Sequence, residues 1–126
     1  MKFYGIGSDI IRNNRIKNSI KNKKFLERVF TKEEIKIGLK KRNNHTFYAK
    51  RFAAKEAFVK ALGTGFRDNI NFNSISILND KNGKPFITYD KIMKKKVQSI
   101  IKKKTFNIFL SLSDEKDYSL AFVIIQ

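Results

Sequence analysis

A glutamate and a lysine, Glu56 and Lys60, lie four residues apart in the stretch RFAAKEAFVKA, which runs from Arg51 to Ala61. The stretch is typical of one helix. A helix turns by about 100° per residue, so residues three and four apart share a face. Glu56 then lies between two groups of small or apolar residues: Phe52, Val59 and Gly63 on one side, and Ala53, Ala57 and Ala61 on the other. An acid and a base placed there are costly unless a partner, a metal ion or a ligand binds them.

The pattern alone leaves three interpretations of Glu56 and Lys60 open. The commonest is a surface ion pair one helical turn apart, which contributes a few tenths of a kcal/mol to stability. The placement among close-packing residues favours instead either a buried structural pair or a ligand site. Between these last two the sequence does not discriminate.

A second acid, Asp9, ends the run FYGIGSD and widens the chemistry open to Glu56. By itself Asp9, or Ser8 before it, is best interpreted as the cap of a following helix. Together with Glu56 it predicts a site for a hard cation, because Mg²⁺ commonly takes one or two carboxylates, several waters and substrate phosphates. Two carboxylates beside a lysine suit phosphate chemistry in which the metal ion bridges a pyrophosphate.

Two other features give weaker predictions. Gly63, Thr64 and Gly65 follow a helix rather than precede one, so they predict a helix end and not a Walker-type phosphate loop. Such an end can still bring backbone N–H groups close to a ligand phosphate. His45 is the only histidine, so a paired-histidine zinc site is excluded. We expect His45 to be solvated in a polar loop, and no supporting signature around it favours a serine hydrolase.

Length and composition indicate one globular domain, residues 1–126. The chain contains no cysteine, which excludes disulfides and thiolate metal sites. No segment is apolar for long enough to span a bilayer, and the N-terminus does not resemble a signal peptide. We therefore expect a cytoplasmic protein that does not bind membranes.

The net charge of +17 has two explanations. One is an acidic partner, such as nucleic acid, an anionic membrane or an acidic protein. The other is a genome poor in G and C, because Lys, Ile, Asn and Phe share A- and T-rich codons, and we assign most of the charge to this cause. The basic run from Arg12 to Arg28 is usually a solvated face, and its functional interpretation is a docking surface for something acidic.

Two rival functions follow from this charge. The first is a nucleic-acid-binding module, whose affinity would fall steeply with salt. The second is a structural scaffold that binds anionic lipid through the lysine-rich, amphipathic residues 90–104. The expected helix at 90–104 directs Ile92, Val97, Ile100 and Ile101 inward.

Periodicity and turn residues predict an α+β fold in which N-terminal helices pack on a mostly antiparallel sheet. Thr31 and Glu34 match a capping box at the start of a helix. The segment 79–83 predicts the tight turn of a hairpin. The expected elements are a strand at 3–10, helices at 11–30, 32–41 and 47–62, strands at 72–78 and 84–89, a helix at 90–104, and strands at 106–113 and 118–125.

Four motifs together resemble a known family. They are GIGSDI from Gly5, RFAAKEAFVKALGTG from Arg51, NGKP from Asn82, and the closing LSLSDEKDYSLAFVII from Leu110. The chain is similar over residues 3–125 to the holo-acyl-carrier-protein synthases, the short bacterial phosphopantetheinyl transferases. This resemblance implies that the phosphopantetheine arm of coenzyme A is moved to a serine of apo-acyl carrier protein, leaving adenosine 3′,5′-bisphosphate, in support of fatty acid biosynthesis.

The resemblance also implies roles for individual residues. Asp9 and Glu56 match the ligands of Mg²⁺, and Lys60 matches a lysine near the phosphates of coenzyme A. Arg51 matches an arginine near the coenzyme A nucleotide, and Gly63 matches the glycine that borders its cleft. A basic residue that meets the acidic helix of the carrier protein is matched by Arg15.

Members of the family are typically homotrimers with coenzyme A bound between subunits, so a homotrimer is expected here. Two positions depart from the family. Many members have a histidine near the nucleotide where this chain has Asp114, and an acid would repel a phosphate, so nucleotide binding is not carried over to Asp114. Arg12 stands where an acid is common.

Overall fold

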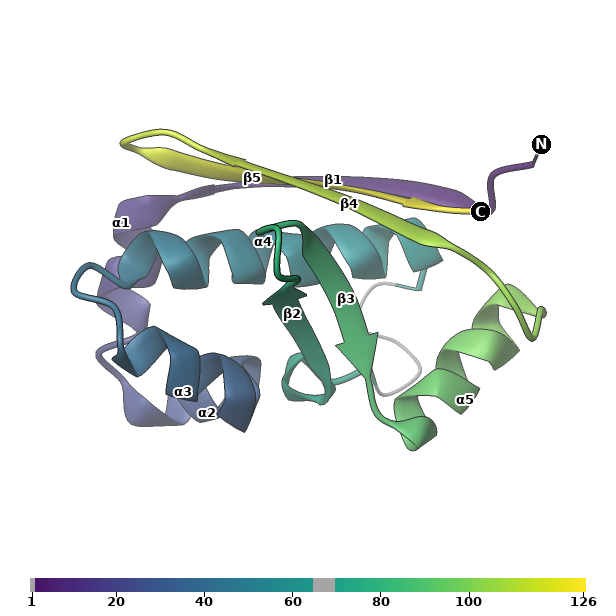
Figure 1. Ribbon diagram of the computed structural model, residues 1–126, viewed down its shortest axis with the longest axis horizontal. Coiled ribbons are helices and arrows are strands. Elements are labelled where there is room, and N and C mark those ends of the chain that lie inside the picture. Colours follow the sequence, from purple (N-terminus) through teal and green to yellow (C-terminus); the bar gives the residue numbers. More distant parts are fainter. Residues whose placement is uncertain (1, 65–69) are drawn as a thin grey trace.

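The computed structural model describes residues 2–64 and 70–126, and it has the expected α+β architecture (Figure 1). A short 3₁₀ helix, η2, spans Phe72–Ser74. The other elements, in chain order, are β1 Gly5–Arg12, α1 Asn13–Ser19, α2 Lys23–Val29, α3 Lys32–Leu39, α4 His45–Leu62, β2 Ile75–Asn79, β3 Pro85–Tyr89, α5 Lys91–Ile101, β4 Ile108–Asp114 and β5 Tyr118–Ile125.

Two antiparallel sheets surround the central helix α4. The larger sheet has the order β1-β5-β4, and β2 and β3 form a separate hairpin. Figure 1 shows α4 running along one face of the larger sheet, with α1, α2 and α3 at one end of the molecule and α5 at the other. Because α4 is covered on several sides, most of its residues are buried, including the charged Arg51 and Lys55.

Strand β1 lies unusually close to α4 because two of its residues have no side chain. A Cβ atom at Gly7 would collide with the carbonyl oxygen of Ala57, and one at Gly5 would collide with that of Ala61. The facing helix residues are alanines, and Ala57 is fully buried. Small residues on both surfaces therefore bring the backbones of β1 and α4 together.

Two predicted boundaries in the N-terminal half are wrong. The strand does not end at Asp9 but continues to Arg12, because Ile11 is buried and the whole of β1 pairs with β5. Asp9 is therefore a mid-strand residue, and neither it nor Ser8 caps α1. The predicted helix at 11–30 is divided into α1 and α2, because Asn22 accepts hydrogen bonds from the backbone of Lys24 and Phe25 and starts a new helix.

Other local predictions are confirmed. The Thr31–Glu34 capping box is present in full at the start of α3. Gly63 ends α4 in the left-handed conformation, with φ 80°, as a helix-stopping glycine does, while Gly65 lies outside the described residues. On α5, Val97 and Ile101 are buried as expected.

The inward face of α5 was misjudged by one residue. Ile92 is 71% exposed, and Met93 is buried in its place, together with Val97 and Ile101. Met93, Val97 and Ile101 recur every four residues and so share one helical face, from which Ile92 is turned away by about 100°. Since this apolar face packs into the core, it is not free to insert into a lipid surface, which removes the basis for the lipid-scaffold hypothesis.

The close approach of β1 to α4 makes Gly7 sensitive to substitution. Gly7→Ala should lower the free energy of unfolding by about 1–3 kcal/mol, because the added methyl group forces the strand away from Ala57. Urea unfolding followed by circular dichroism measures this change. Ser8→Ala, at the exposed neighbouring position, is the control and should stay within about 0.5 kcal/mol of the wild type. Equal midpoints for Gly7→Ala and the wild type would contradict the proposed packing.

Candidate functional site

Lys60 on α4 joins the helix to Asp9 on β1, two residues that are 51 positions apart in sequence. The Lys60 Nζ atom lies 3.1 Å from Oδ1 of Asp9 and donates a second hydrogen bond to the carbonyl oxygen of Ser8 at 2.9 Å. The pairing partner of Lys60 is thus a strand residue. Within the described part of the chain, no ion pair joins Lys60 to Glu56, so the i,i+4 surface pair is not what forms.

Glu56 shares the electrostatic environment of Asp9 and Lys60. Partial burial raises the pKa of the Glu56 carboxyl above its ordinary value of 4.5, and the charge of Asp9 raises that pKa further. The cations Lys60 and Arg15 act in the opposite direction and lower it. The structure therefore brings three of the predicted site residues, Asp9, Arg15 and Lys60, within electrostatic range of a fourth, Glu56.

A mostly apolar cavity of about 260 Å³ opens beside Glu56. Arg28 and Val29, at the end of α2, line it on one side. Further lining residues are Phe52, Ile70, Asn71 and Phe72. The Arg15 guanidinium lies 6.0 Å from the centre of the Phe52 ring, so the basic α1 and α2 segments border the same region as Glu56. Chemically, the site offers carboxylates and an ammonium group beside an apolar slot.

Arg51 lines a different cavity from Glu56, although both lie on α4. Its guanidinium stacks 3.8 Å from the Phe47 ring centre and donates to Oδ1 of Asn79 at 2.8 Å. The residue is only 6% exposed, and this burial lowers its pKa to about 10. Arg51 shares a hollow of about 240 Å³ with Lys50 and Gly83, among others. Within one chain it does not meet the Asp9–Glu56 site.

Gly63 borders a third hollow, at the C-terminal end of α4. Tyr4, Lys95 and Lys102 are among the other residues that line it. The Tyr4 hydroxyl donates to the carbonyl oxygen of Leu62 at 3.1 Å and so fixes the N-terminal segment beside the helix end. The hollow is cationic, but it is separate from the cavity beside Glu56.

An ion pair at Asp114 was missed by sequence reasoning. Lys50 on α4 lies 3.3 Å from Oδ1 of Asp114 at the end of β4. The negative charge that was expected to repel a phosphate is therefore offset by a lysine from another element. Nothing in the local sequence signalled this pairing, because the two residues are distant in the chain.

A second missed feature is a fully buried ion pair between Lys55 and Glu34, both with no exposed side-chain surface. The Lys55 Nζ atom lies 2.5 Å from Oε1 of Glu34. Burial lowers the pKa of Lys55 to about 8, while Glu34 acts in the opposite direction. The sequence had predicted Glu34 only as part of the capping box of a helix, and it had given Lys55 no role beyond its place in the RFAAKEAFVKA stretch.

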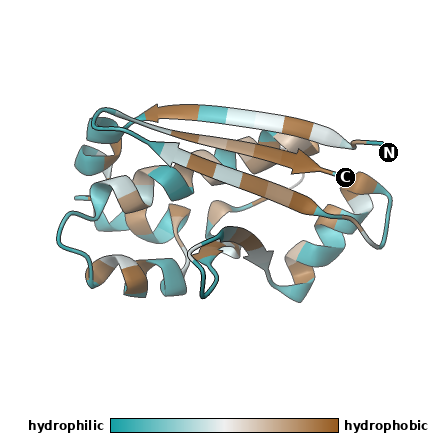
Figure 2. Cartoon of the chain, turned by 45° about the horizontal axis from the view of Figure 1, so that its top comes forward, coloured by the Kyte–Doolittle hydropathy of each residue, from teal (hydrophilic) through white to brown (hydrophobic). Residues whose placement is uncertain are grey.

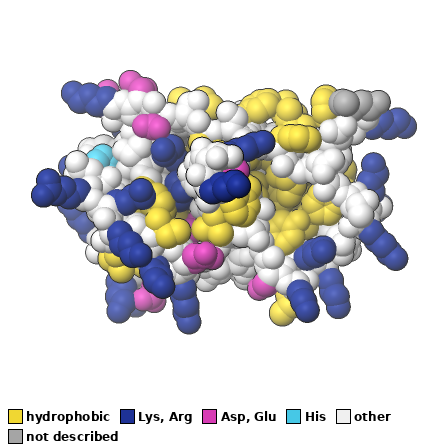
Figure 3. All heavy atoms as spheres, in the orientation of Figure 1, with side chains coloured by type: hydrophobic (Ala, Val, Ile, Leu, Met, Phe, Trp, Pro, Cys, Tyr) yellow, Lys and Arg dark blue, Asp and Glu magenta, His cyan; other side chains and the backbone are white. Residues whose placement is uncertain are grey.

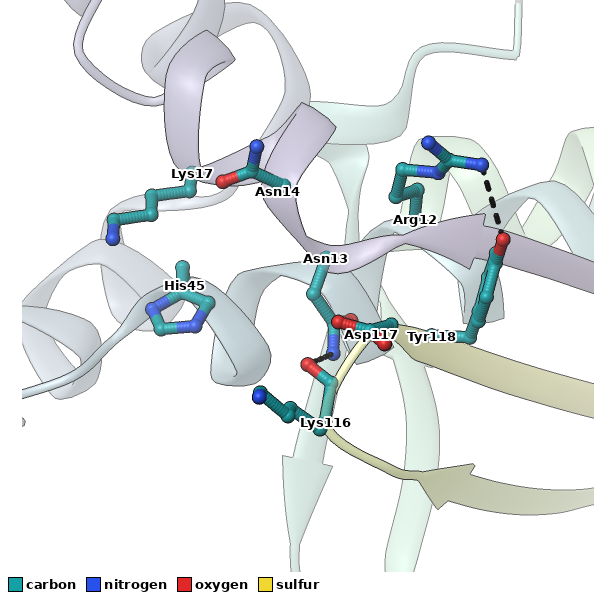
Figure 4. Close-up of a pocket in the computed structure, with 8 residues that line it drawn as sticks. All are labelled: Arg12, Asn13, Asn14, Lys17, His45, Lys116, Asp117 and Tyr118. Carbon is teal, nitrogen blue, oxygen red and sulfur yellow. Dashed lines mark hydrogen bonds between the residues drawn. The ribbon is translucent and has the colours of Figure 1, made fainter.

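The basic cleft in Figure 4 lies at the junction of β1, α1, α4 and the β4–β5 turn, with a volume of about 580 Å³. Asn13 lines the cleft and holds the β4–β5 turn beside it by donating to the carbonyl oxygens of Glu115 and Lys116. Asn13 also accepts a hydrogen bond from the Ser119 hydroxyl at 2.6 Å. His45 lines this cleft as the first residue of α4 and is half-buried, so its expected place in a solvated loop is wrong.

Metal and membrane features of the described residues are limited. Among residues 2–64 and 70–126 no group of three or more His, Cys, Asp or Glu side chains is arranged to hold a metal ion, so the Asp9–Glu56 site is a two-carboxylate arrangement. Nor does any helix of these residues combine the length and apolar character needed to cross a membrane. Lys and Arg side chains extend from the edges of the face shown in Figure 3.

Known proteins resemble this chain along its whole length. Residues 5–123 match the family model described as the 4′-phosphopantetheinyl transferase superfamily. A holo-[acyl-carrier-protein] synthase of Pelagibacter ubique is 57% identical, and the match covers 100% of this chain and 98% of that protein.

Solved structures agree in fold. The holo-[acyl-carrier-protein] synthase of Neisseria meningitidis has a TM-score of 0.88 and 38% identity, covering 99% of each chain. The enzyme of Bacillus anthracis, solved in complex with CoA (3′,5′-ADP), has a TM-score of 0.79 and 34% identity, covering 98% of this chain and 96% of that one. The likeness therefore extends over both the helical half and the sheet.

The raised pKa of Glu56 predicts a gain in stability for Glu56→Gln. Above pH 4.5 the unfolded chain ionises this group more readily than the folded chain, so its ionisation lowers stability as pH rises through the folded-state pKa. Without added Mg²⁺, Glu56→Gln should therefore melt at a higher temperature than the wild type at pH 7.5, and the gain should vanish near pH 4.

Thermal melts across pH in a chelator measure this effect. Glu33→Gln is the control, because Glu33 is exposed in the first turn of α3, where an acid is mildly favourable. That variant should melt at the same or a slightly lower temperature. A lower melting temperature for Glu56→Gln at pH 7.5 would mean that the ionised carboxylate is stabilised in the folded protein.

Proposed function

The chain belongs to the holo-[acyl-carrier-protein] synthases of the 4′-phosphopantetheinyl transferase superfamily, and we propose that Asp9 and Glu56 bind the Mg²⁺ ion on which its reaction depends. Such an enzyme transfers the phosphopantetheine group of coenzyme A to apo-acyl carrier protein. In the proposed reaction the hydroxyl oxygen of a carrier serine bonds to the β-phosphorus and its proton passes to water. The bond from that phosphorus to the bridging oxygen breaks, and adenosine 3′,5′-bisphosphate leaves with that oxygen.

The observation that carries the metal proposal is the nearness of two acids from different elements. Burial and then the charge of Asp9, on β1, raise the pKa of Glu56, on α4, although Lys60 and Arg15 lower it, so the ionised form of Glu56 is disfavoured in the folded chain. A divalent cation between the two carboxylates would relieve this repulsion. The donor set also suits Mg²⁺, which prefers oxygen ligands and keeps coordination positions for water and substrate phosphate. The residues present thus fit the ion.

Lys60 is exposed enough to bind a phosphate of a ligand. Its side chain is 55% exposed although it pairs with Asp9, so the ammonium group remains accessible to a ligand. Bound Mg²⁺ would supply positive charge at the pyrophosphate. Lys60 would add a second positive charge and stabilise the charge that develops on the leaving phosphate. If Asp9 and Glu56 held Mg²⁺, the ammonium group of Lys60 would be released from Asp9 and would be available to a phosphate.

The carrier protein would approach from the side of α1 and α2. Arg15 lies over Phe52 and acts electrostatically on Glu56, and Arg28 lines the adjacent cavity. An acidic partner would be steered to these cations, which raises the rate of association more than the final affinity. We therefore assign Arg15 to carrier-protein docking.

Coenzyme A binding and oligomeric state are linked in this proposal. Arg51 and Gly63 line hollows apart from the Asp9–Glu56 cavity, so their proposed role in coenzyme A binding is easier to satisfy if the nucleotide lies between two copies of the chain. A homotrimer would supply such a site. A cytoplasmic location and a role in fatty acid biosynthesis complete the proposal, and these two rest on the family resemblance alone.

The outer face of the larger sheet supports association between copies. It carries exposed apolar side chains from all three strands, and the strands of this sheet are largely hydrophobic in Figure 2. Contiguous apolar surface of this kind usually marks an interaction site. The residues are Ile6 and Ile10 on β1, Leu120 and Phe122 on β5, and Phe109 on β4.

The activity is tested by the mass of the carrier protein. With coenzyme A and Mg²⁺, the wild type should add one phosphopantetheine mass to apo-acyl carrier protein, and chelation should stop the reaction. Asp9→Asn and Glu56→Gln keep side-chain size but remove a charge, and each should lower the rate by about 100-fold or more. Glu33→Gln, a surface acid, serves as the control with unchanged rate.

Two results would contradict the proposal. Full activity of Asp9→Asn or Glu56→Gln would remove these residues from the metal site. A wild type that transfers nothing, yet binds nucleic acid at physiological salt, would favour the nucleic-acid-binding alternative suggested by the net charge.

Phe122→Lys tests the proposed association. A charge in the centre of the apolar sheet face should convert a trimer into monomers of 14.7 kDa. Light scattering coupled to size-exclusion chromatography reports the mass directly. Leu39→Lys is the matched control, because Leu39 is an exposed leucine on α3, away from that sheet. A wild type that elutes as a monomer at working concentrations would rule out the sheet face as a stable interface.

A further inference from the structure

We propose that Lys55 is a positioning residue for the carrier-protein side of the site, an inference that rests on the proposed function. Its ammonium group, paired with Glu34, holds α2 and η2 against α4 and thereby keeps the cavity beside Glu56 in shape. Lys55 itself is buried and touches no substrate. Its effect would pass through the segments that it holds.

All three hydrogen-bonding positions of the Lys55 ammonium are used. One bond goes to Glu34, and the other two go to the carbonyl oxygens of Val29 at 2.8 Å and Phe72 at 2.9 Å. Val29 is the last residue of α2, and Phe72 is the first of η2. A single buried cation therefore binds the C-terminal end of one segment and the start of another to the middle of α4.

Glu34 is equally well satisfied and extends the connection. Its Oε1 atom accepts from the backbone of Thr31 at 2.9 Å, and its Oε2 atom accepts from the backbone of Ile77 at 2.9 Å. The pair thus also ties α3 and β2 to the same point. A buried pair with every position filled is well suited to fixing relative orientation, because any displacement leaves a charged group or a carbonyl without a partner.

The segments held by Lys55 are walls of the cavity that Glu56 lines. Val29 and Phe72 both line it, and Lys55 precedes Glu56 on α4. The α2 segment also carries Arg28, at the edge of the cavity, and the exposed Lys23 and Lys24. Because this helix has only seven residues, its direction depends on its end contacts. Release of Val29 would therefore move Arg28 and the lysines of α2, which belong to the basic run whose functional interpretation is a docking surface for an acidic partner.

The coenzyme A side of the proposed site should be affected much less. Arg51 and Gly63 line other hollows, and the Lys60–Asp9 pair depends on the contact between α4 and β1. We call the buried Lys55–Glu34 pair and its hydrogen bonds the clamp. Its loss should raise the KM for the carrier protein and leave the KM for coenzyme A nearly unchanged. A purely structural role would lower stability without this asymmetry.

The test compares Lys55→Met, Glu34→Gln and Val97→Ala with the wild type. Lys55→Met keeps a similar length but removes all three hydrogen bonds, and it should raise the KM for apo-acyl carrier protein about tenfold or more while the KM for coenzyme A changes less than about threefold. Val97→Ala creates a cavity in the core at α5, so it should lower the melting temperature but leave both KM values unchanged.

Glu34→Gln keeps the test decisive if Lys55→Met does not fold. It preserves volume and weakens the hold on Lys55, so it should change the same KM in the same direction by a smaller factor. Equal increases in both KM values, or kinetic constants of Lys55→Met or Glu34→Gln that match those of Val97→Ala, would reduce Lys55 to a structural role.

A binding measurement separates failure of this inference from failure of the proposed function. The probe is apo-acyl carrier protein with its acceptor serine replaced by alanine, titrated calorimetrically in the absence of coenzyme A. If the wild type neither transfers phosphopantetheine nor binds this probe, the proposed function fails. If the wild type does both and Lys55→Met binds the probe as tightly, only the clamp is overturned.

Discussion

The direct contact between the backbone of β1 and the helix α4 is the constraint on which the site depends. Gly5 and Gly7 leave no room for a side chain against the carbonyl oxygens of Ala61 and Ala57. Asp9 follows on the same face of the strand and therefore lies within hydrogen-bond distance of Lys60. With larger residues at these positions the strand would stand further from the helix, and Asp9 and Glu56 would no longer share one electrostatic environment.

Helix α4 carries charged residues whose surroundings differ with the direction they face. Lys60 faces β1 at the surface and stays accessible, while Lys55 faces the core and is enclosed by Glu34 and two carbonyl groups. Arg51 points toward the β2–β3 hairpin and stacks on Phe47. One helix therefore carries three cationic side chains with different surroundings: Lys60 as a candidate phosphate ligand, Lys55 in the buried ion pair, and Arg51 as a candidate for binding the nucleotide. They differ because each points in a different direction around the helix axis.

The larger sheet has two apolar faces, of which one is buried and the other is exposed. Its inner face is covered by α4, and residues such as Ala121 and Val123 are fully buried there. The outer face keeps Ile6, Ile10 and Phe122 exposed. An antiparallel sheet usually has one solvated, polar face, and the exposed apolar side chains of this outer face are the observation behind the proposed association. The proposed homotrimer would cover it and would also bring separate hollows of different copies together.

Residue patterns alone were enough to predict the α+β class, the capping box at Thr31, the end of α4 at Gly63, the hairpin and the family, because each of these depends on local spacing or on a motif. The same patterns pointed to Asp9, Glu56 and Lys60. The ion pairs, by contrast, were revealed by the packing of distant elements: Lys60 pairs with Asp9, Lys50 offsets Asp114, and Lys55 is buried with Glu34. The physical reason is that an ionic partner is chosen by distance and burial in space, and helical periodicity contains no information on which strand or helix packs against a given face.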